Sequence, residues 1–381
     1  MKKKIAFPFP HLHKFGGGEI FCEYLTNFLK SYFDVDLYYY KSFQINKKIK
    51  FDKKINLIPV QSKNLILNYL CKNYIFIGHL YILFYLQNKN YNFVFSGAGE
   101  FFHSSKCFQY IHHPFYSLNI FHYLSLGLKK TDIIKIFLRF IISIIARLIF
   151  FINNKKYSKT ITVVNSKFIQ KRFQQIYKYN IARIVYPTFK IPRDFKENFS
   201  RYEKRYNDFV VLGRVSRDKN TLDAVNFFLD FKKNNSYLKF SKIHIIGPID
   251  KNLREKIEEI KKENKDCLFH GYLNLRKRDK ILRESKFGLH FFVGEHFGRS
   301  VLEMQKFGII VFCHKSGGAM EIIPSNLQKF NSIIELKKNI KIILKDPTKR
   351  KKIKKMINKK IHQFSDNQFR KSILKMLRND K

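Results

Sequence analysis

GEHFGRSVLE, residues 294–303, is the stretch of sequence that decides the fold. It follows the apolar run 287–293, which reads as a buried parallel strand, and from Arg299 onward its apolar residues indicate the start of a helix. We therefore expect Glu295 in the loop at the carboxyl end of the strand, and Glu303 about two turns inside the helix. Two carboxylates are thus predicted on either side of one strand-to-helix turn.

A turn of this kind is suited to a particular class of ligand. In an open α/β sheet, the loops at the carboxyl ends of the strands bind ligands, and the amides at a helix N-terminus bind anions. Carboxylates beside the turn add acceptors for hydroxyl groups. The pattern therefore fits a ligand that carries both phosphates and hydroxyls, and a sugar nucleotide is such a ligand.

The composition predicts a large, folded and very basic protein. A chain of 381 residues is too long for one ordinary core, so we expect two domains. The hydrophobic fraction of 45% and the aromatic fraction of 16% exclude a wholly disordered chain. The net charge of +45 has two interpretations. It reflects either a compositional bias toward Lys, Ile, Asn and Phe, or attraction to polyanions such as acidic lipids, nucleic acid or phosphorylated substrates.

The cysteines and the N-terminal residues indicate a cytoplasmic protein. The five cysteines show no Cys-x-x-Cys or Cys/His spacing, so reduced thiols are expected rather than a zinc site or a disulfide framework. The N-terminal lysines precede the apolar run 5–10, which two prolines interrupt and a glycine-rich loop follows. This pattern predicts a first strand rather than a secretion signal.

Strand and helix patterns alternate along both halves of the chain. Strands are expected at residues 5–7, 35–40, 93–96, 107–112, 160–164 and 184–186, and then at 209–212, 243–246, 267–270, 287–293 and 309–313. The polar, aperiodic segment 193–207 reads as a linker between the two series. The predicted fold class is α/β, with two doubly wound Rossmann-like domains at residues 1–195 and 196–365 that face one another across a cleft. Residues 366–381 are expected to form a helical tail, for which a return to the first domain is one option.

The segment 132–152 is nearly all apolar and raises the question of a membrane. Lys135, Arg139, Ser143 and Arg147 interrupt it at steps of four and would lie on one stripe of a helix. Cations near the centre of a spanning helix cost about 2.5 kcal/mol or more each, so we do not predict a membrane span. An amphipathic helix in the interface of an anionic bilayer and a mostly buried helix both fit the pattern.

A series of short motifs follows the order found in one enzyme family. They are Gly16-Gly17-Gly18-Glu19, the sequence YIHHP at 110–114, Asn165-Ser166, VYP at 185–187, Gly213-Arg214 with Lys219-Asn220, the glutamates at 295 and 303, and Gly317-Gly318. On these motifs the chain resembles the retaining glycosyltransferases of family 4, which have the GT-B fold. Within that family it is most similar to the α1,2-mannosyltransferases that act on dolichol-linked oligosaccharide. Ala319 and Glu321 depart from the usual proline and aspartate of the family.

The resemblance implies a donor site in the second domain, which would bind the nucleotide sugar. Glu303 would accept hydrogen bonds from the ribose hydroxyls, and Glu295 would contact hydroxyls of the donor sugar. Phe297 and Gly298 would offer backbone amides to the sugar and the phosphates. His296 lies in the same loop, where contact with the ligand and simple packing are both open.

The resemblance also implies a clamp for the diphosphate. Arg214 and Lys219 follow the predicted strand 209–212, and in the family such a pair neutralises the departing diphosphate. Gly17 and Gly18 would bring the loop of the first, acceptor-side domain to the same group. The plainer interpretations are abundant basic residues and an ordinary tight turn.

His112 is the candidate that the first domain contributes to catalysis. It follows a predicted strand, and the resemblance places it near the donor sugar and the acceptor hydroxyl, where its ring can share a proton.

No metal is expected. Asp34 and Asp36 spell a DxD motif, but alternation along a strand would send both to one face, taken here to be solvent. The family needs no metal, so no metal and no cofactor is predicted.

The resemblance implies a cytoplasmic enzyme, peripheral on the cytoplasmic face of a membrane. It would move a hexose with retention onto a lipid-linked oligosaccharide or a cell-surface polysaccharide. Mannose from GDP-mannose is the expected donor, and a transferase of the same fold that uses a UDP-sugar is the alternative. A basic nucleic-acid-binding protein is a remote alternative, because no binding module is recognised and the charge is spread along the whole chain.

Overall fold

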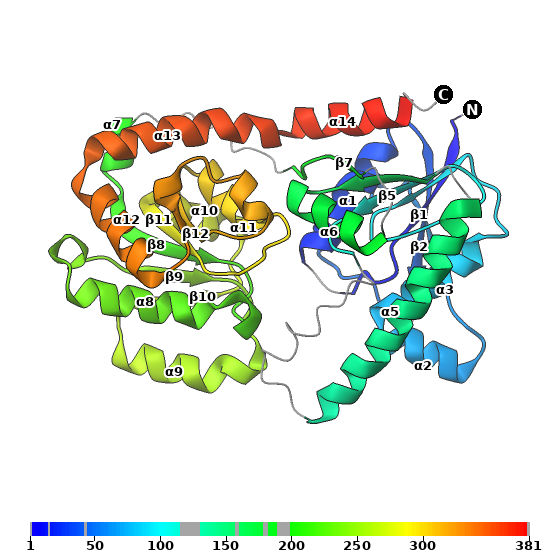
Figure 1. Ribbon diagram of the computed structural model, residues 1–381, viewed down its shortest axis with the longest axis horizontal. Helices are drawn as coiled ribbons and strands as arrows, with labels where there is room; N and C mark the ends of the chain where they lie inside the picture. The colour runs from blue at the N-terminus through cyan, green and yellow to red at the C-terminus, as the bar shows by residue number, and fades with distance from the viewer. Residues whose placement is uncertain are drawn as a thin grey trace. The chain divides into compact units, whose positions relative to one another are not determined.

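The computed structural model describes residues 2–13, 16–41, 44–114, 130–156, 160–177, 182–188 and 199–378. The chain divides into two compact units, Met1–Val185 and Tyr186–Lys381, and each is built on its own parallel sheet (Figure 1). The predicted boundary between residues 195 and 196 stays a prediction, because residues 189–198 lie outside the described residues.

The described residues of the first unit form a seven-stranded parallel sheet in the order β3-β2-β1-β4-β5-β6-β7. The strands are β1 (Lys4–Pro8), β2 (Asp34–Tyr40), β3 (Asn56–Val60), β4 (Phe93–Ser96), β5 (Cys107–Ile111), β6 (Thr160–Val164) and β7 (Ala182–Ile184). The chain starts in the middle, winds outward to β3 and returns to β4. The carboxyl ends of β1 and β4 therefore form a topological switch point, where α/β sheets bind ligands.

Aromatic side chains fill the centre of this first sheet. Phe7 and Phe95 stack with ring centroids 5.8 Å apart, and Phe95 stacks on Phe108 at 6.0 Å. Helices cover the sheet, so its central strands are apolar on both faces. These helices are α1 (Gly17–Leu29), α2 (Leu65–Asn73), α3 (Ile75–Leu86), α5 (Lys130–Lys156) and α6 (Lys167–Tyr177).

The second unit repeats the doubly wound pattern. Its described residues form a six-stranded parallel sheet in the order β10-β9-β8-β11-β12-β13. The strands are β8 (Tyr206–Leu212), β9 (Ile243–Ile246), β10 (Cys267–Gly271), β11 (Ser285–His290), β12 (Ile310–His314) and β13 (Lys329–Phe330). The switch point here lies between β8 and β11, and β11 is the strand that ends in the loop with Glu295.

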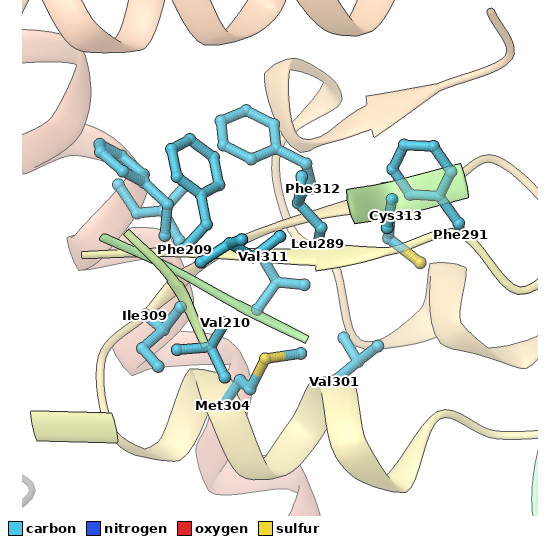
Figure 2. Packing of buried hydrophobic residues seen from close by; sticks show 14 of the residues in the cluster. Phe209, Val210, Leu289, Phe291, Val301, Met304, Ile309, Val311, Phe312 and Cys313 are labelled. Atoms are coloured by element: carbon cyan, nitrogen blue, oxygen red, sulfur yellow. The ribbon is translucent and has the colours of Figure 1, made fainter. Parts of the chain in front are cut away.

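The core of the second unit fixes helix α11 (Arg299–Lys306) beneath the sheet. Figure 2 shows Val301 and Met304 of this helix on one side of the strands and Phe312 on the other. All three are buried. The remaining helices are α7 (Phe199–Glu203), α8 (Thr221–Lys233), α9 (Arg254–Glu263), α10 (Leu275–Glu284), α12 (Ile333–Lys345), α13 (Pro347–Ile361) and α14 (Asp366–Arg378). The GT-B architecture of two doubly wound α/β domains is the one that the sequence predicts.

Some local predictions were wrong. The segment 193–207, expected to be a linker, contains α7 and the first residues of β8. The strand expected over residues 287–293 ends at His290, because the residues after it turn away to form the loop that carries Glu295. The two acids of the DxD motif do not both face solvent. Asp34 is exposed, but Asp36 is only 4% exposed and pairs with Lys4 at 3.0 Å and with the hydroxyl of Tyr91 at 2.7 Å. Asp36 is buried because β3 and the residues around Tyr91 cover this part of the sheet.

Helix α5, which contains the apolar segment 132–152, presents apolar side chains to solvent. Eight large ones are between 37% and 62% exposed: Phe137, Phe140, Ile141, Ile144, Ile145, Leu148, Phe151 and Ile152. The opposite face packs inward through Ser143, Ala146 and Phe150. The predicted polar stripe thus faces partly toward the unit's interior, as Ser143 is buried and Arg147 half-buried. No helix in the described part of the chain is both long and apolar enough to cross a membrane.

Helix α3 carries a buried histidine. His79 is fully buried, and its Nε2 donates a hydrogen bond to the carbonyl oxygen of Glu100 at 2.6 Å. Burial lowers the pKa of His79 to about 4, because an apolar environment disfavours the charged ring. The folded first unit therefore keeps this ring neutral at pH values where an exposed histidine is protonated.

We expect His79 to make the first unit sensitive to acid. The unfolded chain protonates His79 near its ordinary pKa of about 6.5, so between pH 6.5 and 4 the unfolded state binds more protons than the folded state. The free energy of unfolding should fall over that window by about 3 kcal/mol. His79→Gln should remove this part of the pH dependence in urea unfolding at pH 7 and pH 4.5. His362→Gln, at an exposed position, should keep it, and an undiminished acid loss in His79→Gln would contradict the assignment.

Candidate functional site

The loop after β11 holds the first predicted glutamate in a charged and buried setting. The side chain of Glu295 is 14% exposed, and its Oε2 accepts a hydrogen bond from Lys219 Nζ at 3.2 Å. His290 Nε2 lies 3.5 Å from the same oxygen. Burial by itself would raise the pKa of Glu295, but the contact with His290 and the charge of Lys219 outweigh it and hold the pKa well below its ordinary value. Glu295 is therefore a carboxylate at neutral pH.

Lys219 reaches this loop from the turn that follows β8. Its ammonium also lies 3.5 Å from the ring centroid of Phe292, which is a cation–π contact. The next residue, Asn220, adopts a left-handed conformation with φ of 50°, and its side-chain amide donates to the carbonyl oxygen of Phe291 at 3.3 Å. Two adjacent residues thus join the β8 turn to the β11 loop.

Arg214, the second predicted cation, is paired elsewhere. Its guanidinium lies 3.0 Å from Asp218, and its side chain is 53% exposed. In this structure, therefore, Arg214 and Lys219 each contact a different carboxylate. An exposed ion pair four residues apart contributes only about 0.3–0.5 kcal/mol, so an anionic ligand can readily take Arg214 from Asp218.

Glu303 lies in helix α11, just over one turn from its start at Arg299 rather than two. The side chain is 17% exposed, and Oε1 lies 2.6 Å from a terminal guanidinium nitrogen of Arg278 in α10. Burial raises the pKa of Glu303, and the charge of Arg278 opposes this rise. The environments of the two glutamates thus shift their pKa values in opposite directions, down for Glu295 and up for Glu303.

The loop after β12 packs against the Glu295 loop, backbone against backbone. The amide of Gly318 donates to the carbonyl oxygen of Glu295 at 2.6 Å. A Cβ atom on Gly317 would lie 2.3 Å from that same oxygen, and one on Gly318 would lie 2.2 Å from the carbonyl oxygen of His296. Residues larger than glycine do not fit at this contact. The close approach of two loops therefore explains the Gly-Gly motif.

An aromatic cluster supports the same loop from its other end. Phe297 is buried, and its ring centroid lies 6.0 Å from that of Tyr186 and 5.8 Å from that of Phe364. The hydroxyl of Tyr186 donates to Glu321 at 2.8 Å. Gly298, with φ of 100°, then begins helix α11. The tyrosine of the VYP motif and the glutamate that replaces the usual aspartate thus hold the loop in place.

His290 is a residue of this site that the sequence analysis did not select. It is the last residue of β11, is 7% exposed, and directs Nε2 toward Glu295. The prediction of a strand as far as residue 293 placed it inside an apolar strand. A polar side chain inside that apolar run was the available signal. His296, which was selected, donates its backbone amide to the carboxylate of Glu295 at 3.1 Å.

In the first unit, the predicted residues lie at the carboxyl edge of the sheet. His112 follows β5, and its ring contacts the ring of Phe21 in α1 edge-on, with centroids 4.4 Å apart. The side chain of Asn165 donates to the carbonyl oxygen of His112 at 3.1 Å. Gly17 and Gly18 are the first residues of α1. The contact between Phe21 and His112 therefore brings the start of α1 to the end of β5.

The described residues contain no group of three or more His, Cys, Asp or Glu that could hold a metal ion. In particular, Asp36 already has protein partners, as described above. All five cysteines are free and buried.

The comparisons with known proteins concern the whole candidate site of the second unit. Residues 192–360 match the family model of glycosyl transferases group 1, a range that includes every site residue from Arg214 to Glu303. A curated relative is the GDP-Man:Man(3)GlcNAc(2)-PP-Dol alpha-1,2-mannosyltransferase of Candida glabrata, which is 24% identical over 170 residues. The alignment covers 42% of this chain and 34% of that protein, so the match spans about a third of the relative's length.

Solved structures resemble the chain over nearly its full length. One is Alr3699/HepE of Anabaena in complex with UDP and glucose, with a TM-score of 0.64, 15% identity, and coverage of 98% of this chain and 99% of that one. Another is a glycosyltransferase from Rickettsia africae ESF-5, with a TM-score of 0.66, 17% identity, and coverage of 99% and 98%. These likenesses confirm the GT-B fold. Together with the group 1 domain they support a glycosyltransferase enzyme.

The contact between the two loops can be isolated by a matched pair of substitutions. Gly317 and Gly294 have nearly the same φ, 74° and 73°, but a Cβ on Gly294 meets no atom within 4 Å. We expect Gly294→Ala to cost about 1 kcal/mol of unfolding free energy from backbone strain alone. Gly317→Ala should cost about 2 kcal/mol more, because its Cβ forces the loops apart and because its ψ of −171° lies in a region that essentially only glycine adopts. Urea unfolding of both variants measures the difference, and equal losses would show that the loops do not depend on this contact.

Proposed function

We propose that the chain is a glycosyltransferase that moves a hexose from a nucleotide sugar with retention of configuration. The acceptor is a lipid-linked oligosaccharide or a cell-surface polysaccharide. One observation carries the proposal: within the group 1 match, Glu295 and Glu303 stand on either side of the turn into α11 in opposite electrostatic settings. A carboxylate with a lowered pKa and one with a raised pKa, both beside a helix N-terminus, suit a ligand with a sugar, a diphosphate and a ribose.

The donor is proposed to be GDP-mannose. The curated relative is named for GDP-mannose, and that name supports this donor. The alternative is a UDP-sugar, which the complex of Alr3699/HepE with UDP and glucose favours. The same residues serve both donors in this proposal, because they contact the sugar, the phosphates and the ribose rather than the base.

Each part of the donor has a proposed partner in the second unit. Glu303 accepts hydrogen bonds from the ribose hydroxyls, and Glu295 accepts them from the hexose. The diphosphate lies against the first turn of α11, where Phe297 and Gly298 offer backbone amides, and His296 borders the sugar. No metal and no cofactor is part of the proposal, since the nucleotide sugar is itself a substrate.

The departing diphosphate is proposed to be stabilised by two cations that are paired with protein carboxylates in this structure. Lys219 leaves Glu295, and Arg214 leaves the weak surface pair with Asp218. Both then face the negative charge that develops on the leaving group, and this stabilises the transition state more than the bound donor. Release of Lys219 also frees the Oε2 atom of Glu295 for hexose hydroxyls, while His290 remains beside that carboxylate.

The first unit is proposed to contribute to the acceptor side of the reaction. His112 follows the carboxyl end of β5, and its imidazole can hydrogen-bond an acceptor hydroxyl and share its proton. Gly17 and Gly18 leave the start of α1 without bulky side chains, so a diphosphate can approach its amides. Both roles rest on the resemblance to family 4.

A membrane surface is the proposed location of the acceptor. The outward face of α5 exposes a row of large apolar side chains, and such rows commonly mark interaction surfaces. The chain carries a net charge of +45, which attracts it to anionic lipid. A lipid-linked acceptor would lie in that surface, and the relative's name includes such an acceptor. We therefore propose peripheral binding on the cytoplasmic face of a membrane through residues 132–152, and no nucleic-acid partner.

Calorimetric titration with GDP, UDP and their mannose and glucose conjugates tests the donor site. We expect saturable binding of one nucleotide. Glu303→Ala and Arg214→Ala should weaken it by about tenfold or more, because each removes a charge-assisted hydrogen bond. Arg217→Ala, in the same turn as Arg214, is exposed and should bind like the wild type. Protein that is folded by circular dichroism but binds none of these ligands would refute the proposed function.

Sedimentation with vesicles tests the membrane surface. Replacing Ile141 and Ile145 with Glu puts two charges on the exposed apolar face of α5 and should release the protein from vesicles that contain anionic phospholipid. Replacing Tyr237 and Phe240 with Glu changes the net charge by the same amount at exposed apolar positions of the second unit. That control should still sediment. Undiminished sedimentation of the α5 variant would exclude this helix as the binding face.

A further inference from the structure

Arg278 is a charged residue of the site that none of the motifs includes. It lies in α10, and its guanidinium is largely buried, with 21% of the side chain exposed. One terminal nitrogen forms an ion pair with Glu303 Oε1 at 2.6 Å. An arginine from a neighbouring helix thus already occupies one oxygen of the carboxylate to which the ribose is assigned.

The rest of the guanidinium is anchored by the adjacent acid. Nε and the other terminal nitrogen of Arg278 donate to the same oxygen of Asp279, at 3.0 Å and 2.7 Å. A guanidinium is planar and rigid, so fixing these two nitrogens also fixes the direction of the third. Asp279 thereby orients Arg278, and Arg278 orients Glu303. With Oε1 taken, Oε2 is the oxygen of Glu303 that remains for a hydroxyl.

Arg278 is also the main charge that opposes protonation of Glu303. Burial raises the pKa of Glu303, and the charges that face it are Arg278 and Asp279 from α10 and Arg299 and Lys306 from α11. Asp279 raises the pKa further. Lys306 is itself buried, and burial lowers its own pKa to about 7, so its positive charge is only partial at neutral pH. The arginine charge, by contrast, persists at every relevant pH.

We propose that Arg278 is a positioning residue of the donor site, which holds one oxygen of Glu303 so that the other is presented, ionised, to the ribose hydroxyls. The inference rests on the proposed function, because that function assigns the ribose to Glu303. It adds a residue that acts through Glu303 rather than through the reacting atoms.

The test measures the binding of GDP and of UDP by calorimetry between pH 5.5 and pH 8.5. Arg278→Gln removes the charge that opposes the rise in the Glu303 pKa, so protonation should abolish binding at a higher pH than in the wild type. We expect binding at pH 7 to weaken roughly tenfold and the acid limb to move up by about one pH unit. Arg276→Gln removes an exposed arginine from the same helix and should leave both unchanged.

A double-mutant cycle separates positioning from general electrostatics. If Arg278 acts through Glu303, adding Arg278→Gln to Glu303→Gln should cause no further loss of binding. A further tenfold loss, or an unmoved acid limb in Arg278→Gln, would overturn the inference. If Arg278→Gln does not fold, Arg278→Lys keeps the charge without the fork, and wild-type binding in that variant would equally overturn it. Absence of nucleotide binding in the wild type would refute the proposed function instead.

Discussion

The site depends on the contact between the loops that follow β11 and β12. Gly317 and Gly318 let one backbone lie directly on the other, and the amide of Gly318 binds the carbonyl oxygen of Glu295. Because this contact is between main-chain atoms, it fixes the path of the backbone without the help of any side chain. The direction of Glu295, the burial of Phe297 and the start of α11 all follow from that path.

Two ion pairs hold the carboxylates of the site. Glu295 is held by Lys219, and Glu303 is held by Arg278. Each pair crosses from one loop or helix to another, so each joins elements that are distant in sequence. The buried carboxylates remain paired because an isolated buried charge is costly. Their pKa values nevertheless move in opposite directions. At Glu295 the contact with His290 and the charge of Lys219 outweigh burial, whereas at Glu303 burial prevails and Asp279 adds to it.

Much of this arrangement was predictable from local sequence. The alternation of strands and helices indicated two doubly wound sheets, and the spacing of the glutamates placed them around one strand-to-helix turn. What the sequence could not show was long-range pairing. From the sequence Asp36 was expected to face solvent, but in the structure it is bonded to Tyr91. Arg278 is one of 74 basic residues, and only its ion pair with Glu303 in the folded protein distinguishes it. The outward direction of the apolar side chains of α5 also depends on tertiary packing.

The pairing of Lys219 with Glu295 sets a cation against a carboxylate within the site. Under the proposed function, a free inorganic anion that attracts Lys219 would take the ammonium partner from Glu295, because such an anion brings no hydroxyl groups to replace the ammonium. In the proposed function, a nucleotide sugar would satisfy both residues at once, with phosphates for the lysine and hydroxyls for the glutamate. Under the proposed chemistry, loss of the hexose would return Glu295 to competition for Lys219 and loosen the remaining nucleoside diphosphate. The same ion pair would then disfavour the binding of simple anions and favour the release of the nucleoside diphosphate product.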